Sequence, residues 1–451
     1  METQRNTTTL KVLENCRLAP PPASVPRTAH RLTFFDAMWL EVPPVQRLFF
    51  YHFSNPTTTT LLSNLKRSLS LTLQIFYPLA GNLTYSPETD HHEILYTDGD
   101  SVKLTIAESN SDFDHLIGSH PRDVTDFHRL APHLPGYDSL PAPVLALQVT
   151  LFPNSGFCIG ISVHHAAADG STSMHFMKSW ASFCRSGDAA SIKPLPIYDR
   201  TQTSGLDWIT KNHFREMEKV KARESFDVVG VTSKPHVVRT TFVLSRASIE
   251  RLRDWVSSRL VEGSEKDSRV SSFVLTVAYV WVCLIKARGP VDSEKMAHLV
   301  FAVDCRARMD PPLPVAYFGN CIGSCYVHAK VSDMSREDGV VVAAESIGRA
   351  IRALGGDGLL RGAEGWIRKF MELASDRIFS VAGSPRLRVY DTDFGWGKPK
   401  KVEVLSIEGT GAMSLAESRD EEGGIEIGLA LPDLEMNGFD SLFKEGLKSL
   451  A

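Results

Sequence analysis

Two runs of apolar, β-favouring residues near position 150 form the clearest pattern in the chain. The runs at 143–152 and 157–165 are separated by "PNSG", a composition typical of a tight turn, so together they predict a β-hairpin. A helix is expected over 169–187, where Asp169 or Ser171 would cap the start and Gly187 would end it. The segment "SVHHAAADGS" at 162–171 therefore joins the end of a strand to the start of a helix.

The rest of the chain also divides into segments with helical or β-type patterns. A run of 13 apolar residues at 273–285 predicts a helix buried on nearly all sides, capped by Ser271 or Ser272. An amphipathic helix is predicted from leucines that share one face: Leu61, Leu62, Leu65, Leu69 and Leu73. Further helices are expected over 244–260, 334–375 and 436–450. Strands are expected over 31–40, 298–308, 386–395, 401–409 and 423–431.

Strands and helices alternate in both halves of the 451 residues, which predicts an α/β protein made of two similarly built parts. A chain of this length exceeds the size at which a single core stops growing, so two domains are expected. The mixed, proline-containing stretch 191–240 is interpreted as a crossover between an N-terminal domain, 1–190, and a C-terminal domain, 241–451.

Composition and charge exclude several classes of function. The net charge of −4 argues against a nucleic-acid-binding protein, which normally carries a basic excess. No apolar run is long enough to cross a bilayer, and the first residues lack the pattern of a signal or transit peptide. Seven scattered cysteines are typical of reduced thiols, and Cys321 and Cys325 have no second pair nearby to complete a metal site. We expect a cytoplasmic monomer with no metal and no permanently bound cofactor.

The adjacent histidines His164 and His165 are the best candidates for acid–base chemistry. Neighbouring residues on a strand point to opposite faces, so only one of the two can face a given cleft. Small residues follow the pair at the end of the strand and leave room for a ligand. An imidazole with a pKa near ~6.5 can act as a general base at neutral pH, whereas histidines buried at a strand end would serve packing alone. Asp169 would either hold the imidazole or pair with an arginine and fix the loop.

Three motifs give the chain a resemblance to a known family. His165, Asp169 and Gly170 form H-x-x-x-D-G, "DFGWG" occupies 393–397, and "YFGNC" occupies 317–321. The chain thereby resembles the BAHD family of plant acyl-CoA-dependent acyltransferases, and family-like segments run from "LTFFDAMWL" to the last helix. The resemblance implies two chloramphenicol-acetyltransferase-like domains, each a mixed β-sheet with flanking helices, with an active-site channel at their interface.

The resemblance also implies roles for individual residues. His165 would be the general base, and Asp169 would point away from the reacting atoms and pair with Arg306, with Arg308 as the rival partner. Asp393 is sometimes grouped with the histidine as catalytic, but its glycine-rich and aromatic surroundings indicate a structural role. The residues expected to form the structural motifs are Asp169, Gly170, Arg306, Phe394, Gly395, Trp396 and Gly397.

Substrate-binding residues follow from the chemistry of the two substrates. Coenzyme A phosphates require cations, and basic residues cluster just before the helix that begins near Ser271, where an N-terminus also attracts anions. Phe35 and Trp39 would line the acyl or acceptor pocket, although core packing suits both aromatic residues equally well. A malonyl carboxylate requires a cation, and Lys178 or Arg419 would supply it. The residues expected to bind coenzyme A are Arg253, Ser271, Ser272 and Ser384.

These features predict an enzyme that transfers an acyl group from acyl-CoA, with malonyl-CoA as the first choice. The acceptor would be a sugar hydroxyl of a flavonoid, anthocyanin or other phenolic glucoside, because "YFGNC" and "SVAGSPRLRVYDTDFGWGKP" look like the malonyl-using members of the family. Three alternatives stay open: a hydroxycinnamoyl-CoA-dependent glycoside acyltransferase, a catalytically silent relative that binds a metabolite, and a hydrolase. Neither nucleic acid nor membrane is expected as a partner.

Overall fold

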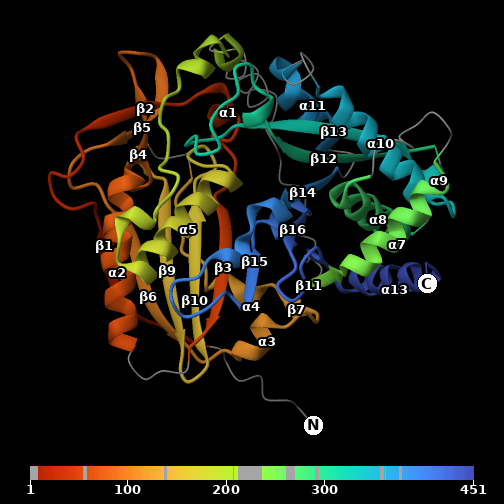
Figure 1. Cartoon of the computed structure of the whole chain (residues 1–451), viewed down its shortest axis with the longest axis horizontal. Helices are drawn as coiled ribbons and strands as arrows, with labels where there is room; N and C mark the ends of the chain where they lie inside the picture. The colour runs from red at the N-terminus through yellow and green to blue at the C-terminus, as the bar shows by residue number, and fades with distance from the viewer. Residues whose placement is uncertain are drawn as a thin grey trace.

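Two large sheets, one in each half of the chain, dominate the structure (Figure 1). The predicted α/β class, with two mixed sheets and flanking helices, is confirmed. A four-stranded sheet accompanies the two large ones. The computed structural model describes residues 9–53, 58–136, 140–206, 208–211, 236–260, 270–289, 294–355, 360, 362–374 and 378–450.

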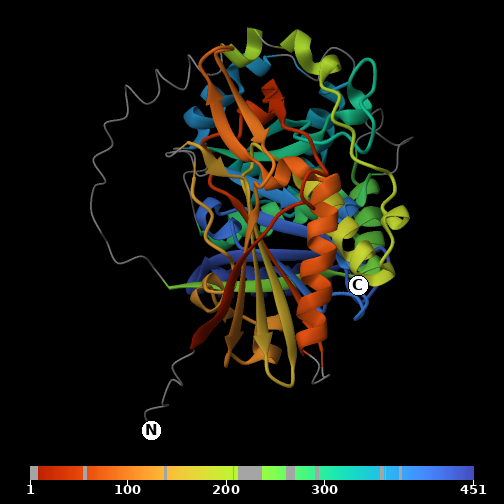
Figure 2. The ribbon, with the colours of Figure 1, turned by 90° about the vertical axis from the view of Figure 1, so that its left-hand side faces the viewer.

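The first large sheet has six strands and carries the predicted hairpin. Its spatial order is β1 (Leu10–Leu18), β6 (Val102–Ser109), β9 (Leu145–Phe152), β10 (Gly156–Val163), β3 (Val45–His52) and β15 (Lys401–Val404). Helices α2 (Thr58–Ile75) and α5 (Gly170–Ser186) share a core with this sheet and lie against each other (Figure 2). β10 is buried at every position, and its one hydroxyl, on Ser162, donates to the Pro132 carbonyl. The α2 leucines at the predicted spacing are buried in that core: Leu61, Leu65, Leu69 and Leu73.

The second large sheet has seven strands and packs against the helix predicted to be buried on nearly all sides. Its order is β13 (Ile322–Lys330), β12 (Met296–Asp304), β14 (Phe379–Gly383), β16 (Met413–Glu417), β17 (Ile425–Pro432), β11 (Val237–Leu244) and β7 (Arg122–Asp123). Helix α8 (Ser272–Ala287) lies in its core and is buried from Val274 to Ile285. The helices around it are α7 (Arg246–Ser257), α10 (Gly339–Ala353) and α13 (Asp433–Ser449). Within the described ranges, no helix combines the length and apolar character that crossing a membrane requires.

Shorter elements connect and cover the two large sheets. The four-stranded sheet has the order β2 (Thr28–Arg31), β5 (His91–Tyr96), β4 (Asn82–Ser86) and β8 (Ala142–Pro143). The short helices are α1 (Phe34–Ala37), α3 (Phe113–Ile117), α4 (Thr125–His128), α9 (Val331–Met334), α11 (Trp366–Ala374) and α12 (Ile407–Thr410).

Two strand predictions are wrong, each for a local reason. The segment 31–40 contains helix α1 because Thr33 and Asp36 form a reciprocal capping box across its first turn. The segment 386–395 forms two short 3-10 turns, and Arg388 adopts a left-handed conformation between them. The strands found within 386–431 are β15, β16 and β17, of which β16 is not predicted.

The two halves exchange strands. β15 comes from the second half of the chain and pairs antiparallel with β3, whereas β7 comes from the first half and pairs with β11 (Figure 1). Each large sheet therefore gains an edge strand from the other half. The domain boundaries at 190 and 240 stay predictions, and most of the crossover, 212–235, lies outside the described residues.

A buried cluster of charges sits where the exchanged strands meet. Glu403 on β15 forms ion pairs with Arg122 at 2.9 Å and with Arg239 at 3.1 Å, and Lys401 lies 3.8 Å from the same carboxylate. All four side chains are almost completely buried. Burial by itself would raise the pKa of Glu403, but the charges of Arg122, Lys401 and Arg239 hold it at about 2. The cluster thus ties both exchanged strands to β11.

The Glu403→Gln variant should be strongly destabilised. It leaves Arg122 and Arg239 buried without their shared anion, and breaking a buried ion pair on one side costs about 3–5 kcal/mol. Chemical denaturation would measure this loss in the free energy of unfolding. Glu445→Gln, which removes an exposed carboxylate from α13, serves as the control and should change stability by less than about 0.5 kcal/mol. Equal stability of the two variants would contradict the role given to Glu403.

Candidate active site

His164 continues the line of β10 and belongs to the core. Its backbone N–H donates to the Val144 carbonyl at 2.9 Å, its side chain has no exposed surface, and its Nδ1 accepts from the Ala166 N–H at 3.3 Å. Burial and, to a smaller extent, the charge of the nearby His165 lower the pKa of His164 to about 4. A fully buried, neutral imidazole of this kind fits a packing role.

His165, the next residue, is partly exposed and stacks on Trp39. The two rings lie 4.0 Å apart between centroids at an interplanar angle of 11°. Burial lowers the pKa of His165, while its own backbone carbonyl, Asp169 and Asn320 act in the opposite direction. The ring is therefore neutral near pH 7 and can accept a proton. Trp39, predicted to line the acyl or acceptor pocket, is thus in direct contact with the histidine.

Asp169 anchors the start of α5, and its carboxylate contacts Thr172, Arg306 and Cys321. One carboxylate oxygen caps the helix by accepting from the Thr172 N–H at 2.9 Å, and the other lies 2.8 Å from Arg306 Nη1. The second oxygen also accepts from the Cys321 N–H at 3.1 Å. Burial alone would raise the pKa of Asp169, but the charge and hydrogen bond of Arg306 lower it overall. The structure thus contains the Asp169–Arg306 ion pair that the resemblance implies.

The loop 317–321, which carries "YFGNC", is held against this ion pair. Arg306 Nη2 donates to the carbonyls of Tyr317 and Gly319 at 3.3 and 3.1 Å, and the Thr172 hydroxyl donates to the Gly319 carbonyl at 2.8 Å. Gly319 has φ +119°, and a side chain there would meet Arg200 Nη2 at 2.8 Å. Only glycine therefore fits this position without strain.

Asn320 in the same loop connects the backbone of His165 to a second buried carboxylate. Its Nδ2 donates to the His165 carbonyl at 2.9 Å and to Asp36 Oδ1 at 3.0 Å, and its backbone N–H donates to the same Asp36 oxygen at 2.8 Å. Asp36 has no exposed surface, caps α1 through Thr33, and forms an ion pair with Arg200. We call the set Asp36, Asp169, Arg200, Arg306 and Asn320 the histidine clamp.

Sequence reasoning missed three members of the histidine clamp. Asp36 lies in "LTFFDAMWL", where the pattern T-x-x-D could have signalled a capping box. Asn320 lies within "YFGNC", which was recognised as a motif without a physical role. Arg200 gives no sequence signal, because its contact with Asp36 joins residues far apart in the chain.

The "DFGWG" motif forms a turn at the other end of α5. Asp393 Oδ1 accepts from the N–H groups of Gly395 and Gly397 at 2.8 and 3.0 Å, and both glycines have positive φ. Asp393 Oδ2 lies 3.7 Å from Arg185, which is in the last turn of α5. Phe394 is buried against Trp180 and Tyr51. Trp396 packs on Phe53 and Phe157.

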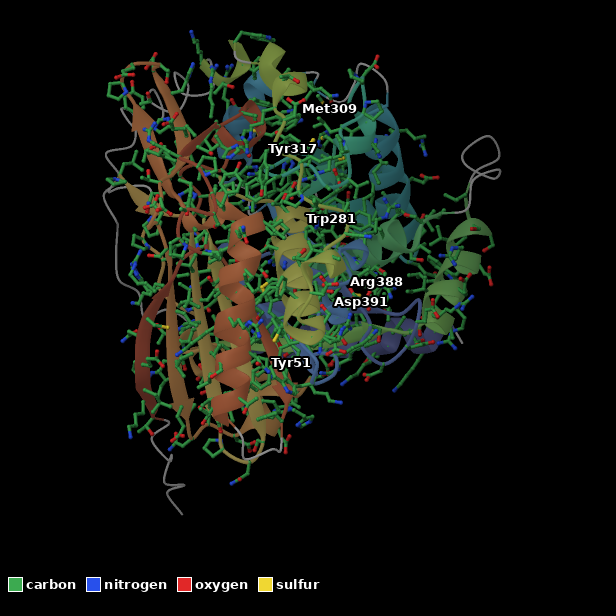
Figure 3. The ribbon with its side chains drawn as sticks, turned by 60° about the vertical axis from the view of Figure 1, so that its left-hand side comes forward. Tyr51, Trp281, Met309, Tyr317, Arg388 and Asp391 are labelled. Atoms are coloured by element: carbon green, nitrogen blue, oxygen red, sulfur yellow. The ribbon has the colours of Figure 1, made fainter. Side chains whose placement is uncertain are left out.

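Asp393 and His165 are consequently far apart. The 17 residues of α5 correspond to about 25 Å between the turn that follows His165 and the turn that contains Asp393. Figure 3 places Tyr317, beside the histidine clamp, and Tyr51, against Phe394, well apart along this direction. Asp393 therefore stabilises a turn and does not contact His165.

The residues predicted to bind coenzyme A make contacts within the protein. Arg253 is buried, donates to the Val270 carbonyl and the Ser272 hydroxyl, and pairs with Glu250. Ser271 caps α8 by accepting from the Val274 N–H. Ser384 in turn accepts from the Arg386 N–H. Part of the basic cluster before α8, 261–269, lies outside the described residues.

The other residues predicted to line the substrate pocket, Phe35, Lys178 and Arg419, lie in different parts of the structure. Phe35 is fully buried in a small core with Tyr317 and Trp366. Lys178 donates to the Leu387 carbonyl at 2.8 Å, and burial lowers its pKa. Arg419 donates to the carbonyls of Lys400 and Ile117 and to the Ser119 hydroxyl, and it lies 3.5 Å from Glu426. Lys178 and Arg419 therefore both donate hydrogen bonds to groups of the protein itself.

Within the described residues, no group of three or more His, Cys, Asp or Glu side chains has the arrangement of a metal site. The cysteines are free thiols, and burial raises the pKa of Cys321 and of Cys325.

Comparison with known proteins gives full-length matches. The model of the Transferase family matches residues 18–445. The chain is 39% identical to a coumaroyl-CoA:anthocyanidin 3-O-glucoside-6''-O-coumaroyltransferase of Arabidopsis thaliana, over 98% of both chains. It is also 39% identical to phenolic glucoside malonyltransferase 2 of the same plant, over 98% of this chain and 100% of the relative. An anthocyanin 3-O-glucoside malonyltransferase of Dahlia pinnata is 37% identical over 98% of this chain and 99% of the relative.

Solved structures share the fold at lower sequence identity. Vinorine synthase superposes with a TM-score of 0.70 at 23% identity and covers 98% of both chains. TRI101 of F. graminearum, solved with coenzyme A and T-2 mycotoxin, superposes with a TM-score of 0.69 at 16% identity. That comparison covers 92% of this chain and 97% of TRI101. These values support the two-domain acyltransferase fold expected from the three motifs.

Replacing Asn320 by Ala should destabilise the protein around His165. The variant loses the bond to the His165 carbonyl and one of the two bonds to Asp36 Oδ1. The His165 carbonyl is left without this donor, which costs about 1–3 kcal/mol. Denaturant titration would give the loss in unfolding free energy, and amide hydrogen exchange would locate it at 164–168. Asn110→Ala, at an exposed bond to the Thr9 N–H, is the matched control. Unchanged exchange near His165 in Asn320→Ala would contradict the clamp.

Proposed function

This chain belongs to the BAHD family of acyl-CoA-dependent acyltransferases, and we propose that it transfers an acyl group to a sugar hydroxyl of a phenolic glucoside, with malonyl-CoA as the donor. The observation that carries the proposal is a neutral, partly exposed His165 whose backbone is fixed by Asn320 and by the turn that Asp169 anchors. The similarity to glucoside acyltransferases along the whole chain supports the class of acceptor.

The proposed reaction proceeds in one ternary complex. The neutral imidazole of His165 removes the proton of the acceptor hydroxyl as the oxygen attacks the thioester carbonyl carbon. The tetrahedral intermediate collapses, the C–S bond breaks, and the coenzyme A thiolate leaves. A thiolate is a good leaving group because thiols have pKa values near ~8.5, and the imidazolium returns its proton to give the free thiol. An ester and coenzyme A are the products.

The contacts of each residue limit its role in this reaction. His165 is the catalytic residue, and Asp169, Arg306 and Asn320 are positioning residues because they act through its backbone and the turn that follows. Trp39 lies parallel to the imidazole, and an aromatic face favours a positive charge beside it, so it would stabilise the imidazolium formed during proton transfer. We propose a structural role for Asp393, since its carboxylate is bound by the backbone of its own motif.

A panel of donors and acceptors tests the proposal. Malonyl-, coumaroyl- and acetyl-CoA would be offered with several phenolic glucosides, and products identified by mass. We expect acylated glucoside, with the highest kcat/KM for malonyl-CoA. His165→Ala should lose transfer by about 10²–10⁴-fold, the usual contribution of a general base, whereas His164→Ala should keep transfer and lose stability.

Each alternative outcome of the donor and acceptor panel would indicate a different function. A preference for coumaroyl-CoA would replace malonyl by an aromatic donor and leave the acceptor class unchanged. Release of coenzyme A without any glucoside would indicate a hydrolase, and no release with any donor would indicate a catalytically silent relative. Equal losses of transfer in folded His164→Ala and His165→Ala would refute the assignment of the base.

The pH dependence of kcat/KM should report the pKa of His165. Burial lowers this pKa, and the base must be neutral to act, so the rate should be constant near pH 7 and fall as the pH drops through a midpoint below 6.5. Initial rates between pH 4.5 and 8 would locate the midpoint. The residual rate of His165→Ala should not show this fall at low pH. A midpoint above 6.5 in the unaltered protein would contradict the environment described for His165.

A further inference from the structure

Arg47 on β3 is a buried cation that the fold leaves without a partner. Only 7% of its surface is exposed, and its Nε is buried with no hydrogen-bond partner. Within the described ranges no hydrogen bond or ion pair reaches any nitrogen of its guanidinium. The neighbouring buried cations Arg122, Arg239 and Lys401 all share the carboxylate of Glu403.

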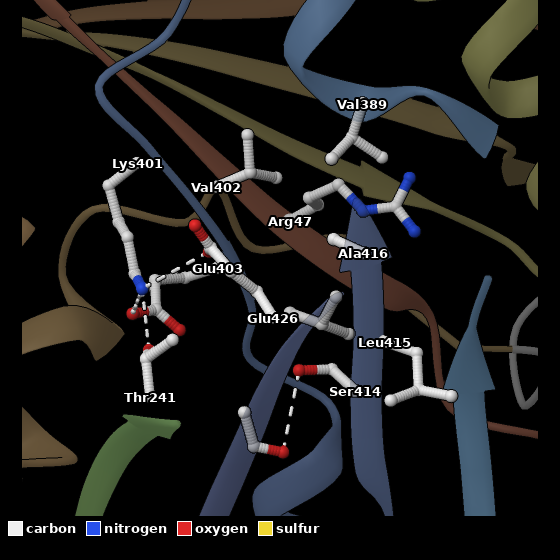
Figure 4. Close-up of a pocket in the computed structure, with 12 residues that line it drawn as sticks. Arg47, Thr241, Val389, Lys401, Val402, Glu403, Ser414, Leu415, Ala416 and Glu426 are labelled. Atoms are coloured by element: carbon white, nitrogen blue, oxygen red, sulfur yellow. Dashed lines mark hydrogen bonds and ion pairs between the residues drawn. The ribbon is translucent and has the colours of Figure 1, made fainter. Parts of the chain in front are cut away.

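The Arg47 side chain points into a small cavity between the two large sheets. The cavity is bounded by Val389, Val402 and Leu415 on its apolar side. Its polar side is formed by Thr241, Ser414, Lys401 and the carboxylates of Glu403 and Glu426, which pair with Arg239 and Lys401 respectively. Figure 4 shows the guanidinium beside Val389 and Ala416, pointing away from Lys401 and Glu403. The guanidinium of Arg47 is therefore directed away from Lys401 and Glu403, within a cavity of about 20 Å³ that would have to widen before a group larger than a water molecule could enter.

The nearest carboxylate does not neutralise Arg47. Glu417 acts on Arg47 through its charge but is not within ion-pair distance, and one of its oxygens accepts from the Tyr390 N–H at 2.8 Å. Its other oxygen is buried without a partner, and burial raises the pKa of Glu417. An uncompensated buried cation is costly, so an anion entering this cavity would be strongly favoured.

The strand register places this cation near His165. Arg47 pairs with Ile161 and Val45 pairs with Val163 across β3 and β10, and His165 follows two residues after the end of β10. Four residues of extended chain correspond to about 13 Å between the Cα atoms of Arg47 and His165. Side chains stand roughly perpendicular to a strand, so they do not shorten this separation. The acceptor hydroxyl together with a short acyl group that ends in a carboxylate would have to span it.

We propose that Arg47 binds the free carboxylate of a dicarboxylic acyl donor of the malonyl type and thereby selects the donor. A guanidinium suits this task because it binds a carboxylate through two parallel hydrogen bonds. Lys178 and Arg419, the cations expected from the sequence, already donate to protein groups. The inference rests on the proposed acyl transfer and names the residue that sets its donor.

The test compares Arg47→Gln with Arg336→Gln, which removes an exposed arginine at the protein surface. Arg47→Gln should lower the ratio of kcat/KM for malonyl-CoA to that for acetyl-CoA by about 10- to 100-fold, as expected for loss of a charge-assisted hydrogen bond. Arg336→Gln should leave the ratio unchanged. Arg47→Lys keeps the charge and should recover part of it.

The role of Arg47 can also be tested by donor binding, which does not require acyl transfer. On a His165→Ala background, calorimetry should give a malonyl-CoA affinity about 10- to 100-fold weaker after Arg47→Gln, with acetyl-CoA affinity nearly unchanged. Thermal unfolding would check that both variants are folded. An equal loss for malonyl-CoA and acetyl-CoA would overturn the proposal, as would an unchanged ratio. Absence of acyl transfer from every donor would instead refute the proposed function, while the binding comparison would still decide the role of Arg47.

Discussion

The ion pair between Asp169 and Arg306 is the contact on which the arrangement around His165 depends. Asp169 begins α5 in one half of the chain, and Arg306 follows β12 in the other. The same arginine holds the carbonyls of the loop 317–321, which places Asn320 against the backbone of His165. Because both charges are buried, removing Arg306 would leave Asp169 without a cation, and removing Asp169 would leave Arg306 with only the exposed Asp304 at 3.3 Å. The position of the imidazole is thus a property of both halves together.

Local pattern was enough to predict the elements that carry the site. The hairpin β9–β10, the helix α5 with its cap Asp169, and the buried helix α8 with its cap Ser271 follow from hydrophobic periodicity and turn chemistry, which act over a few residues. The prediction for 31–40 is wrong because a capping box outweighed the β-favouring composition. β16 was missed because its five residues, Met413–Glu417, form a short mixed sequence; it pairs with the adjacent strand β17 and with the more distant β14.

The site itself was predictable only in part. His165 and the pair Asp169–Arg306 came from strand alternation and from the family resemblance. A local pattern could have marked Asp36 as a capping residue, but its contacts with Arg200 and Asn320 join distant segments, which no local pattern encodes. Arg47 could not be singled out from the sequence, because a sequence does not show which cations are paired in the folded protein. In the structure, Lys178 and Arg419 donate to protein groups, whereas the Nε of Arg47 has no hydrogen-bond partner.

The exchange of β15 and β7 gives the chain a property that neither half would have alone. A sheet edge presents unpaired backbone groups, and natural proteins cover such edges because they promote aggregation. Here β3 is covered by a strand that is synthesised hundreds of residues later, while β11 is covered by one made early. During synthesis, the β3 edge of the first sheet therefore stays unpaired until β15 has been made. A gene split at the crossover would yield two fragments that each expose an apolar, pairing-competent edge, so their solubility would depend on finding each other.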